Sequence, residues 1–280
     1  MDELELASEN GNLARLKELY KPETTPSLPS PESLRRLLRL CIPPRHTQIL
    51  EYLLDQNPDY HWWADIEYDI IRSAVHAGLE IFQVLLARKP DIINWYFGVG
   101  RGNPLTEAVR ENNIELLLFL LANGANAGEP QEPPGPPLLR AVQWDNRERC
   151  VQILAPQSPH DCRVEALKEA VVHGRSCAVM RVILDAGIDV NCVLDPWSEY
   201  ALSMGTLDES AFHVAIRVRD EDTVRLFLEY GADWNSCDAK GVSGMDKARQ
   251  QGKGSEVLKV LESSIGSLPC PRNDQLNGGE

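Results

Sequence analysis

This sequence lacks the motifs that catalytic and cofactor sites require. The glycine-rich segment 98–102 is not followed by the Gly-Lys-Ser/Thr of a phosphate-binding loop. Residues 240–244 place their glycines out of register with the G-x-S-x-G motif of a nucleophilic serine. His160 and Cys162, separated only by Asp161, could supply two metal ligands. No second pair of ligands accompanies them, whereas structural zinc sites need four. The sequence therefore predicts no enzyme activity, no cofactor and no metal site.

Long apolar runs and paired cysteines are also missing. The longest apolar run, Leu116 to Ala122, is far shorter than the ~20 residues of a membrane-spanning helix. The chain starts Met1-Asp2-Glu3, which is acidic where a signal peptide carries positive charge. The seven cysteines are scattered without a C-x-x-C pair, as is typical of reduced thiols. We therefore expect a soluble intracellular protein, nuclear or cytoplasmic or both, that does not enter a membrane.

Basic residues are too few to cover a nucleic-acid surface. Lys and Arg number 28 against 42 Asp and Glu, so the formal net charge is −14. Nucleic-acid binding relies on Lys and Arg side chains that neutralise phosphates. The densest basic cluster, Arg35, Arg36 and Arg39, lies among leucines in a helical stretch, which is typical of a solvated helix face. We expect no direct binding to nucleic acid.

What the chain does contain is an internal repeat. A small residue followed by the same apolar pattern recurs at close to 33 residues, at Ala7, Cys41, Ala74, Ala108, Ala141, Ala170, Ala215 and Ala248. Seven intervals separate these eight positions, and five of the seven are 33 or 34 residues long. A fixed period in this range indicates a solenoid of stacked units, because no single unit covers its own apolar face. Function is then expected on a surface and not in a buried pocket.

The clearest copies resemble the ankyrin repeat. Asn103-Pro104-Leu105-Thr106-x-Ala108 follows the family's T-P-L-H-x-A pattern at proline, leucine and alanine, and Phe212-His213-Val214-Ala215 keeps the histidine. The endings Leu228-x-x-Gly231-Ala232-Asp233-x-Asn235 and Leu184-x-x-Gly187-x-Asp189-x-Asn191 resemble the family's L-x-x-G-A-D-x-N. The resemblance implies an all-α ankyrin-repeat solenoid of about eight stacked helix-turn-helix units. It also implies that His213 connects one finger, the loop before each first helix, to the next finger by hydrogen bonds.

Simple physical reasons support this resemblance. The small residue suits a close helix crossing, where leucine would push the helices apart. Pro104 suits the first turn of a helix, where its missing N–H needs no partner. Gly124, Gly187 and Gly231 follow a second helix, where a left-handed residue is needed. We expect one array over residues 1–262, with repeats near 1–20, 33–57, 67–94, 103–127, 136–155, 164–191, 209–235 and 238–262.

The irregular intervals predict local departures from the repeat. The 29-residue step to Ala170 indicates a truncated finger near residues 155–159. The 45-residue step to Ala215 indicates an insertion near 192–206. Residues 263–280 are expected to form a disordered tail. We also expect Gly252 and Gly254 to weaken the helix of the last repeat, at ~0.8–1 kcal/mol each relative to alanine.

The ankyrin resemblance also implies where a partner binds. In that family the residues two and three positions after the alanine, together with the finger, line a concave face. On this chain those positions are His76 and Ala77, Arg110 and Glu111, Gln143 and Trp144, Val172 and His173, and Arg217 and Val218. Tryptophan is a frequent hot-spot residue, so Trp144 is the first candidate anchor, flanked by Arg110 and His173. The alternative is that Trp144 packs on the proline-rich finger at 133–137.

Other aromatic residues are secondary candidates. Trp197 and Tyr200 lie in the predicted insertion and are expected to be exposed. Trp62, Trp63 and Trp95 lie in connections between repeats, where we expect about half of such rings to be buried. The full set of partner-binding candidates is therefore Trp144, Arg110, His173, His76, Arg217, Trp197 and Tyr200.

Several functions are compatible with these features. The first is a monomeric module that holds another protein on an acidic concave face, such as a transcription factor with a basic segment. The degenerate repeats and the Met-Asp-Glu-Leu start also resemble filamentous-fungal ankyrin proteins, some of which co-regulate gene clusters for secondary metabolites. The alternative is a substrate-targeting adaptor of a ubiquitin ligase or another cytoplasmic scaffold. A third reading, an enzyme site within the array, has room only at the 45-residue step.

Overall fold

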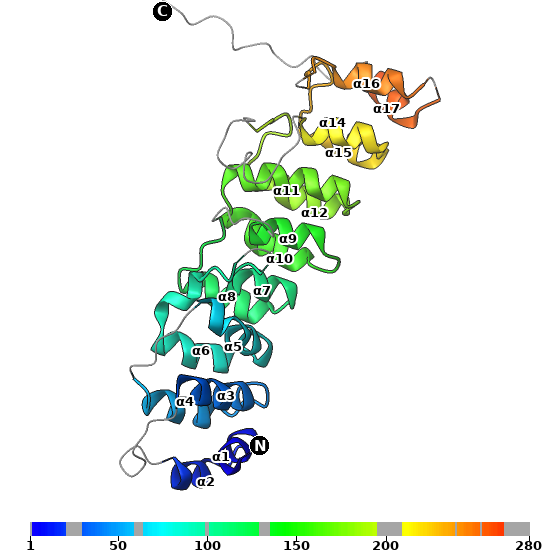
Figure 1. The fold of residues 1–280 in the computed structure, drawn as a ribbon. Coiled ribbons are helices and arrows are strands. Elements are labelled where there is room, and N and C mark those ends of the chain that lie inside the picture. The colour runs from blue at the N-terminus through cyan, green and yellow to red at the C-terminus, as the bar shows by residue number, and fades with distance from the viewer. Residues whose placement is uncertain are drawn as a thin grey trace, which may run out of the picture. The chain divides into compact units, whose positions relative to one another are not determined.

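A computed structural model describes residues 2–20, 30–58, 64–98, 101–128, 135–194, 209–238, 240–252 and 254–265. These residues contain sixteen α-helices and no β-strand, with one isolated bridge between Cys237 and Ser243. Figure 1 shows the helices arranged as successive antiparallel pairs. The prediction of an all-α repeat solenoid with about eight helix pairs is confirmed.

The first compact unit, residues 1–137, holds four helix pairs. Its elements are α1 (Glu3–Glu9), α2 (Leu13–Leu19), α3 (Pro31–Cys41), α4 (Thr47–Asp55), α5 (Ala64–Ala77), α6 (Leu79–Arg88), the 3₁₀ turn η1 (Pro90–Asn94), α7 (Pro104–Arg110) and α8 (Ile114–Ala122). The first helices of the pairs, α1, α3, α5 and α7, pack in that order. The second helices, α2, α4, α6 and α8, form a parallel row. Each pair therefore buries its apolar face against its neighbours.

The second compact unit, residues 138–280, repeats this arrangement, with α9 beginning at its boundary. Its elements are α9 (Pro137–Gln143), α10 (Glu148–Leu154), the 3₁₀ turn η2 (Ala155–Gln157), α11 (His160–Val172), α12 (Cys177–Asp185), α14 (Ala211–Val218), α15 (Glu221–Glu229), α16 (Gly244–Gln250) and α17 (Glu256–Ile265). First helices α11, α14 and α16 pack in order, as do second helices α10, α12, α15 and α17. Only Ser158 and Pro159 separate η2 from α11, at the place where the sequence predicts a truncated finger.

The turn inside each helix pair has a left-handed residue that the sequence pattern did not reveal. These residues, one per pair, are Gly11, Arg45, Gly78, Asn112, Asn146, Gly174, Arg219 and Gly252. At Arg45 the backbone N–H donates to Ile42 (2.9 Å), and the next N–H donates to Cys41 (3.0 Å). These two bonds form a Schellman motif, which satisfies carbonyls at the end of the first helix. The small residue of the repeat therefore also supplies a carbonyl to the turn.

Helix ends elsewhere follow the local sequence. Pro104 begins α7, and the Asn103 side chain caps it by accepting the Thr106 N–H at 2.9 Å. Gly124, Gly187 and Gly231 adopt positive φ after the second helices, as their positions predict.

Two expectations about the last repeat are wrong. Gly252 and Gly254 lie between α16 and α17 and not in a helix, and Gly252, with φ +99°, occupies the left-handed turn position. Glycine is the residue best suited to that conformation, so Gly252 does not weaken the repeat. The array also extends past residue 262. Helix α17 continues to Ile265, and the Ser263 and Ser264 hydroxyls donate to the Val260 carbonyl at 2.8 and 2.9 Å. Residues 266–280 of the predicted tail lie outside the described residues.

Side chains also connect consecutive repeats. The buried His213 ring lies 2.8 Å from the Ser210 hydroxyl through Nδ1 and 3.0 Å from the Ser236 carbonyl through Nε2. The role implied by the resemblance, tying one finger to the next, is therefore confirmed. Asn191 makes a similar link, because its side chain donates to the Gly231 carbonyl (3.1 Å) and accepts the Asp233 N–H (2.8 Å).

Candidate functional site

Those predicted partner-binding residues that the structure describes belong to the first helices of the pairs or to the ends of those helices. We call the solvent-accessible side of α3, α5 and α7 in the first unit, and of α9, α11 and α14 in the second, the inner-helix face. Five of the seven candidates lie on it: His76, Arg110, Trp144, His173 and Arg217. Trp197 and Tyr200, and also Trp62 and Trp63, lie outside the described residues.

In the first unit the structure brings His76 and Arg110 together at one carboxylate. His76 Nε2 on α5 lies 3.1 Å from Glu111 Oε1, and Arg110 Nε on α7 lies 3.7 Å from the same oxygen. The helical register explains this meeting, because α5 and α7 pack side by side at the same height of the repeat. Sequence reasoning placed Glu111 on the face but did not identify it as the link.

Beneath this pair lies a carboxylate that the sequence reasoning missed. The side chain of Glu107 is only 1% exposed and forms an ion pair with Arg110 of its own helix. Arg72 Nε lies 3.8 Å away, and the Tyr68 hydroxyl donates to Glu107 at 3.3 Å. A buried carboxylate needs such partners, because burial of an unpaired charge is strongly unfavourable. The adjacent helices α5 and α7 are thus joined by a charged cluster as well as by apolar packing.

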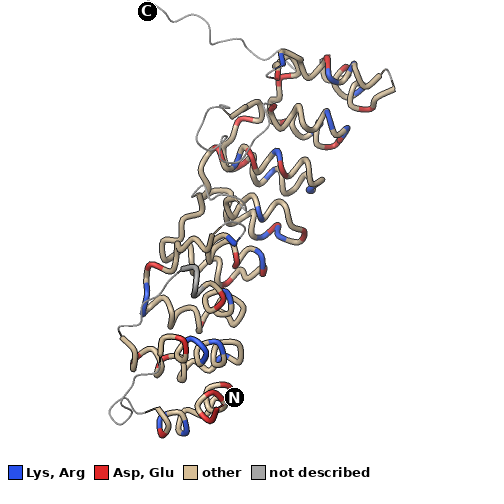
Figure 2. Tube along the Cα trace, in the orientation of Figure 1, with Lys and Arg blue, Asp and Glu red and all other residues tan. Residues whose placement is uncertain are grey.

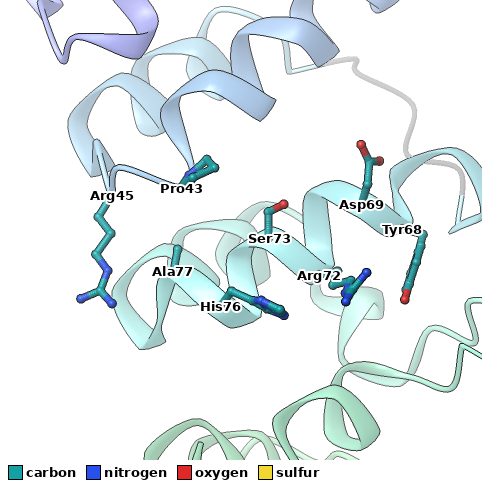
Figure 3. Close-up of a pocket in the computed structure, with 8 residues that line it drawn as sticks. All are labelled: Pro43, Arg45, Tyr68, Asp69, Arg72, Ser73, His76 and Ala77. Atoms are coloured by element: carbon teal, nitrogen blue, oxygen red, sulfur yellow. The ribbon is translucent and has the colours of Figure 1, made fainter. Parts of the chain in front are cut away.

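A hollow of about 420 Å³ opens beside this cluster, lined by Pro43, Arg45, Tyr68, Asp69, Arg72, Ser73, His76 and Ala77. Figure 3 shows Tyr68, Arg72 and His76 spaced along one side of α5, with Asp69, Ser73 and Ala77 on the adjoining stripe. A spacing of four residues places such side chains on one face of a helix. Arg45 reaches the hollow from the turn after α3.

The groups near this hollow form ion pairs with one another and are poorly suited to a metal. His76, Glu107 and Glu111 place ligand atoms within 4.8 Å of one another. However, Arg72 and Arg110 both contact the Glu107 carboxylate, and their positive charge opposes a bound cation. The arrangement therefore favours an ion-pair cluster that displays charge at the surface.

In the second unit the same register carries a tryptophan. Trp144 immediately follows α9 and is half-buried, and the Arg140 guanidinium carbon lies 5.5 Å from its ring centroid. This distance allows a cation–π contact. His173 stands on the neighbouring repeat, with Nε2 3.2 Å from Glu169, and Gln143 donates to that carboxylate at 3.3 Å. The ends of α9 and α11 are therefore joined by a polar bridge beside the tryptophan.

Two valines extend this part of the face. Val172, at the end of α11, is 49% exposed, and Val218, at the end of α14, is 42% exposed. They lie at the same end of two helices that pack against each other. Arg217 is also exposed and forms an ion pair with Glu209 at 3.0 Å. Sequence reasoning placed both valines at face positions but did not rank them as candidates, because register alone does not report exposure.

The face is not the acidic surface that the net charge suggests. In the first unit Arg39 pairs with Asp69, Arg72 with Glu107 and His76 with Glu111, so each carboxylate has a basic partner on a neighbouring helix. Figure 2 shows acidic and basic positions interspersed in each unit. On α3, α5 and α7 the predicted acidic face therefore carries paired acidic and basic side chains, because net charge does not fix how charges are distributed.

Comparison with known proteins agrees with this geometry. A family model described as ankyrin repeat matches residues 208–239, which include α14, α15 and the finger that holds Ser236. A search of curated proteins gives no match. Within the described residues, no helix is long and apolar enough to cross a membrane. The matched segment is similar to the ankyrin repeat, and the other helix pairs of the described residues repeat its arrangement, which supports an ankyrin-repeat protein.

Proposed function

We propose that this chain is a non-enzymatic module that holds another protein on its inner-helix face. The observation that carries the proposal is the exposure of Val172 and Val218, which lie at the same end of their first helices as the half-buried Trp144 does of α9. Tryptophan is a frequent anchor of protein interfaces, and exposed valines add the apolar area that the core of an interface buries. Ankyrin repeats typically act as interaction domains.

We further propose that the partner is a transcription factor and that the chain acts, as a monomer, as its co-regulator. The support is electrostatic. A net charge of −14 disfavours direct contact with DNA and, at long range, steers the basic segment of a DNA-binding protein toward the chain, although the carboxylates Asp69, Glu107 and Glu111 of the face are paired. Residence in the nucleus or cytoplasm and control of a secondary-metabolite gene cluster belong to the same proposal and rest on the resemblance alone. A targeting adaptor of a ubiquitin ligase is the alternative.

Site-specific cross-linking tests the binding proposal. A photoreactive amino acid is placed at Trp144 or Val172 on the face, and at Gln152, an exposed residue of the second helix α10, as the control. Cells of the native host are irradiated, and the cross-linked proteins are identified by mass spectrometry. The proposal expects the same protein from both face positions and not from Gln152. Equal recovery from all three positions would contradict a binding face.

The identity of the cross-linked protein separates the finer readings. A transcription factor supports the co-regulator, whereas a ligase subunit supports the adaptor. Purified chain is expected to give no gel shift with DNA at moderate salt, and its complex with the partner is expected to weaken from about 50 to 300 mM salt, because exposed charge pairs are screened. Sub-micromolar binding of naked DNA would contradict the electrostatic argument.

A further inference from the structure

Arg45 occupies a backbone conformation that ordinary residues avoid. Its φ is +65°, in the left-handed region, where a side chain crowds the backbone. The corresponding residue is glycine or asparagine in six of the eight helix pairs, and the other exception is Arg219. An arginine at this position is unfavourable for stability, and strain of this kind is concentrated at functional sites.

The Arg45 side chain is also a cation without an internal partner. Within the described part of the chain, its exposed guanidinium makes no hydrogen bond or ion pair. By contrast, Arg39 is paired with Asp69, and Arg72 with Glu107. Because the one carboxylate lining the 420 Å³ hollow, Asp69, is already paired, Arg45 leaves this hollow with a positive charge that is not balanced.

A second hollow, of about 340 Å³, adjoins the first and adds two carboxylates to its lining. Arg45, His76 and Ala77 line both hollows, whereas Glu80 and Glu115 line only the second. Both glutamates are exposed on second helices. The two hollows therefore present a basic group followed by acidic groups along one stretch of the surface.

We infer that these adjoining hollows bind a partner segment that carries acidic residues next to basic residues, with an acidic side chain held by Arg45. The inference rests on the proposed protein-binding function and specifies one contact within it. Charge complementarity selects this occupant, because a carboxylate satisfies Arg45 and a Lys or Arg satisfies Glu80 and Glu115. It also gives the Arg45 side chain a role that glycine, which is better suited to the backbone, cannot fill.

Synthetic peptides and two matched variants test the inference. The probes are fluorescent hexapeptides of three glutamates followed by three lysines, of six glutamates and of six lysines. Arg45→Gly removes the charge and the unfavourable conformation together. Arg219→Gly makes the same two changes in the second unit and is the control. Fluorescence anisotropy measures affinity, and NMR signals of the arginine Nε–H groups locate the contact.

We expect the mixed peptide to bind and to shift the Arg45 signal. Arg45→Gly is expected to weaken its binding at least fivefold, while the urea midpoint stays equal or rises. Arg219→Gly is expected to leave peptide affinity unchanged. Unchanged affinity in Arg45→Gly, or binding of the six-lysine peptide alone, would overturn the inference. If cross-linking from Trp144 and Val172 still captures a partner, the proposed function survives that failure.

Discussion

The inner-helix faces of the two units share one backbone register and differ in chemistry. In the first unit the face carries His76, Arg110 and Glu111, which form ion pairs with one another over the buried Glu107. In the second it carries Trp144 and the exposed Val172 and Val218. The charges of the first unit are largely satisfied internally, whereas the apolar groups of the second are not. The same repeat position therefore holds neighbouring helices together in the first unit and offers apolar contact area to a partner in the second.

The largest expected effect comes from the buried carboxylate. Glu107→Ala should lower the free energy of unfolding by about 3 kcal/mol, because it leaves Arg72 and Arg110 without their shared partner. Glu169 holds the same place before the small residue of its repeat but is 27% exposed. Glu169→Ala should cost less than ~1 kcal/mol. Urea unfolding followed by circular dichroism measures the free energy of unfolding of both variants. Equal losses would contradict the proposed difference between the units.

Truncation of the tryptophan should instead affect binding. Trp144→Ala is expected to reduce partner affinity about 30-fold, which corresponds to ~2 kcal/mol, while helical content stays near that of the wild type. The matched change in the first unit is His76→Ala, for which we expect a smaller loss. Titration with the partner that cross-linking identifies measures the affinity of both variants. If Trp144→Ala lowers the melting temperature and leaves affinity unchanged, the tryptophan serves packing.

The units should also respond differently to acid. Burial lowers the pKa of His213 below its ordinary value, so its neutral form is preferred in the folded state. The unfolded chain then binds more protons below about pH 6.5, and stability should fall as pH drops from there through the lowered pKa. Thr106 occupies the same position in the first unit and does not titrate. His213→Gln should reduce the change of the urea midpoint between pH 7.5 and 5.5. If the midpoint of the variant changes with pH as much as that of the wild type, other groups cause the acid response.

The smallest expected effect concerns the left-handed turns. Arg219→Gly should raise the free energy of unfolding by about 0.5–1 kcal/mol, since glycine adopts positive φ without steric conflict. Asn112→Gly should change the free energy of unfolding by only about a few tenths of a kcal/mol, because asparagine already tolerates this backbone region. Thermal denaturation of the paired variants makes the comparison. A loss of stability in Arg219→Gly would show that its side chain contributes contacts that outweigh the strain.

Part of the fold is readable from individual residues. Ala108 and its equivalents mark each first helix, Pro104 marks a helix start, and Gly124 marks a helix end, because small size, a missing N–H and a permitted positive φ are local properties. The role of His213 follows from the family resemblance. The left-handed turn was missed because Arg45 and Arg219 carry no local signal for it. Gly252 was misjudged for a different reason, because the sequence did not show that helix α16 ends before it.

The candidate site divides in the same way. Sequence by itself determined the repeat, the helical class, the net charge and the positions that face outward, because period and composition depend only on residue order. Tertiary structure decided which of those positions matter. Glu107 became a buried partner of two arginines, Arg45 remained unpaired beside a hollow, and Val172 remained exposed. Apart from the Arg110–Glu107 pair within α7, these outcomes depend on distances between residues of different repeats, which only the stacking of neighbouring helices establishes.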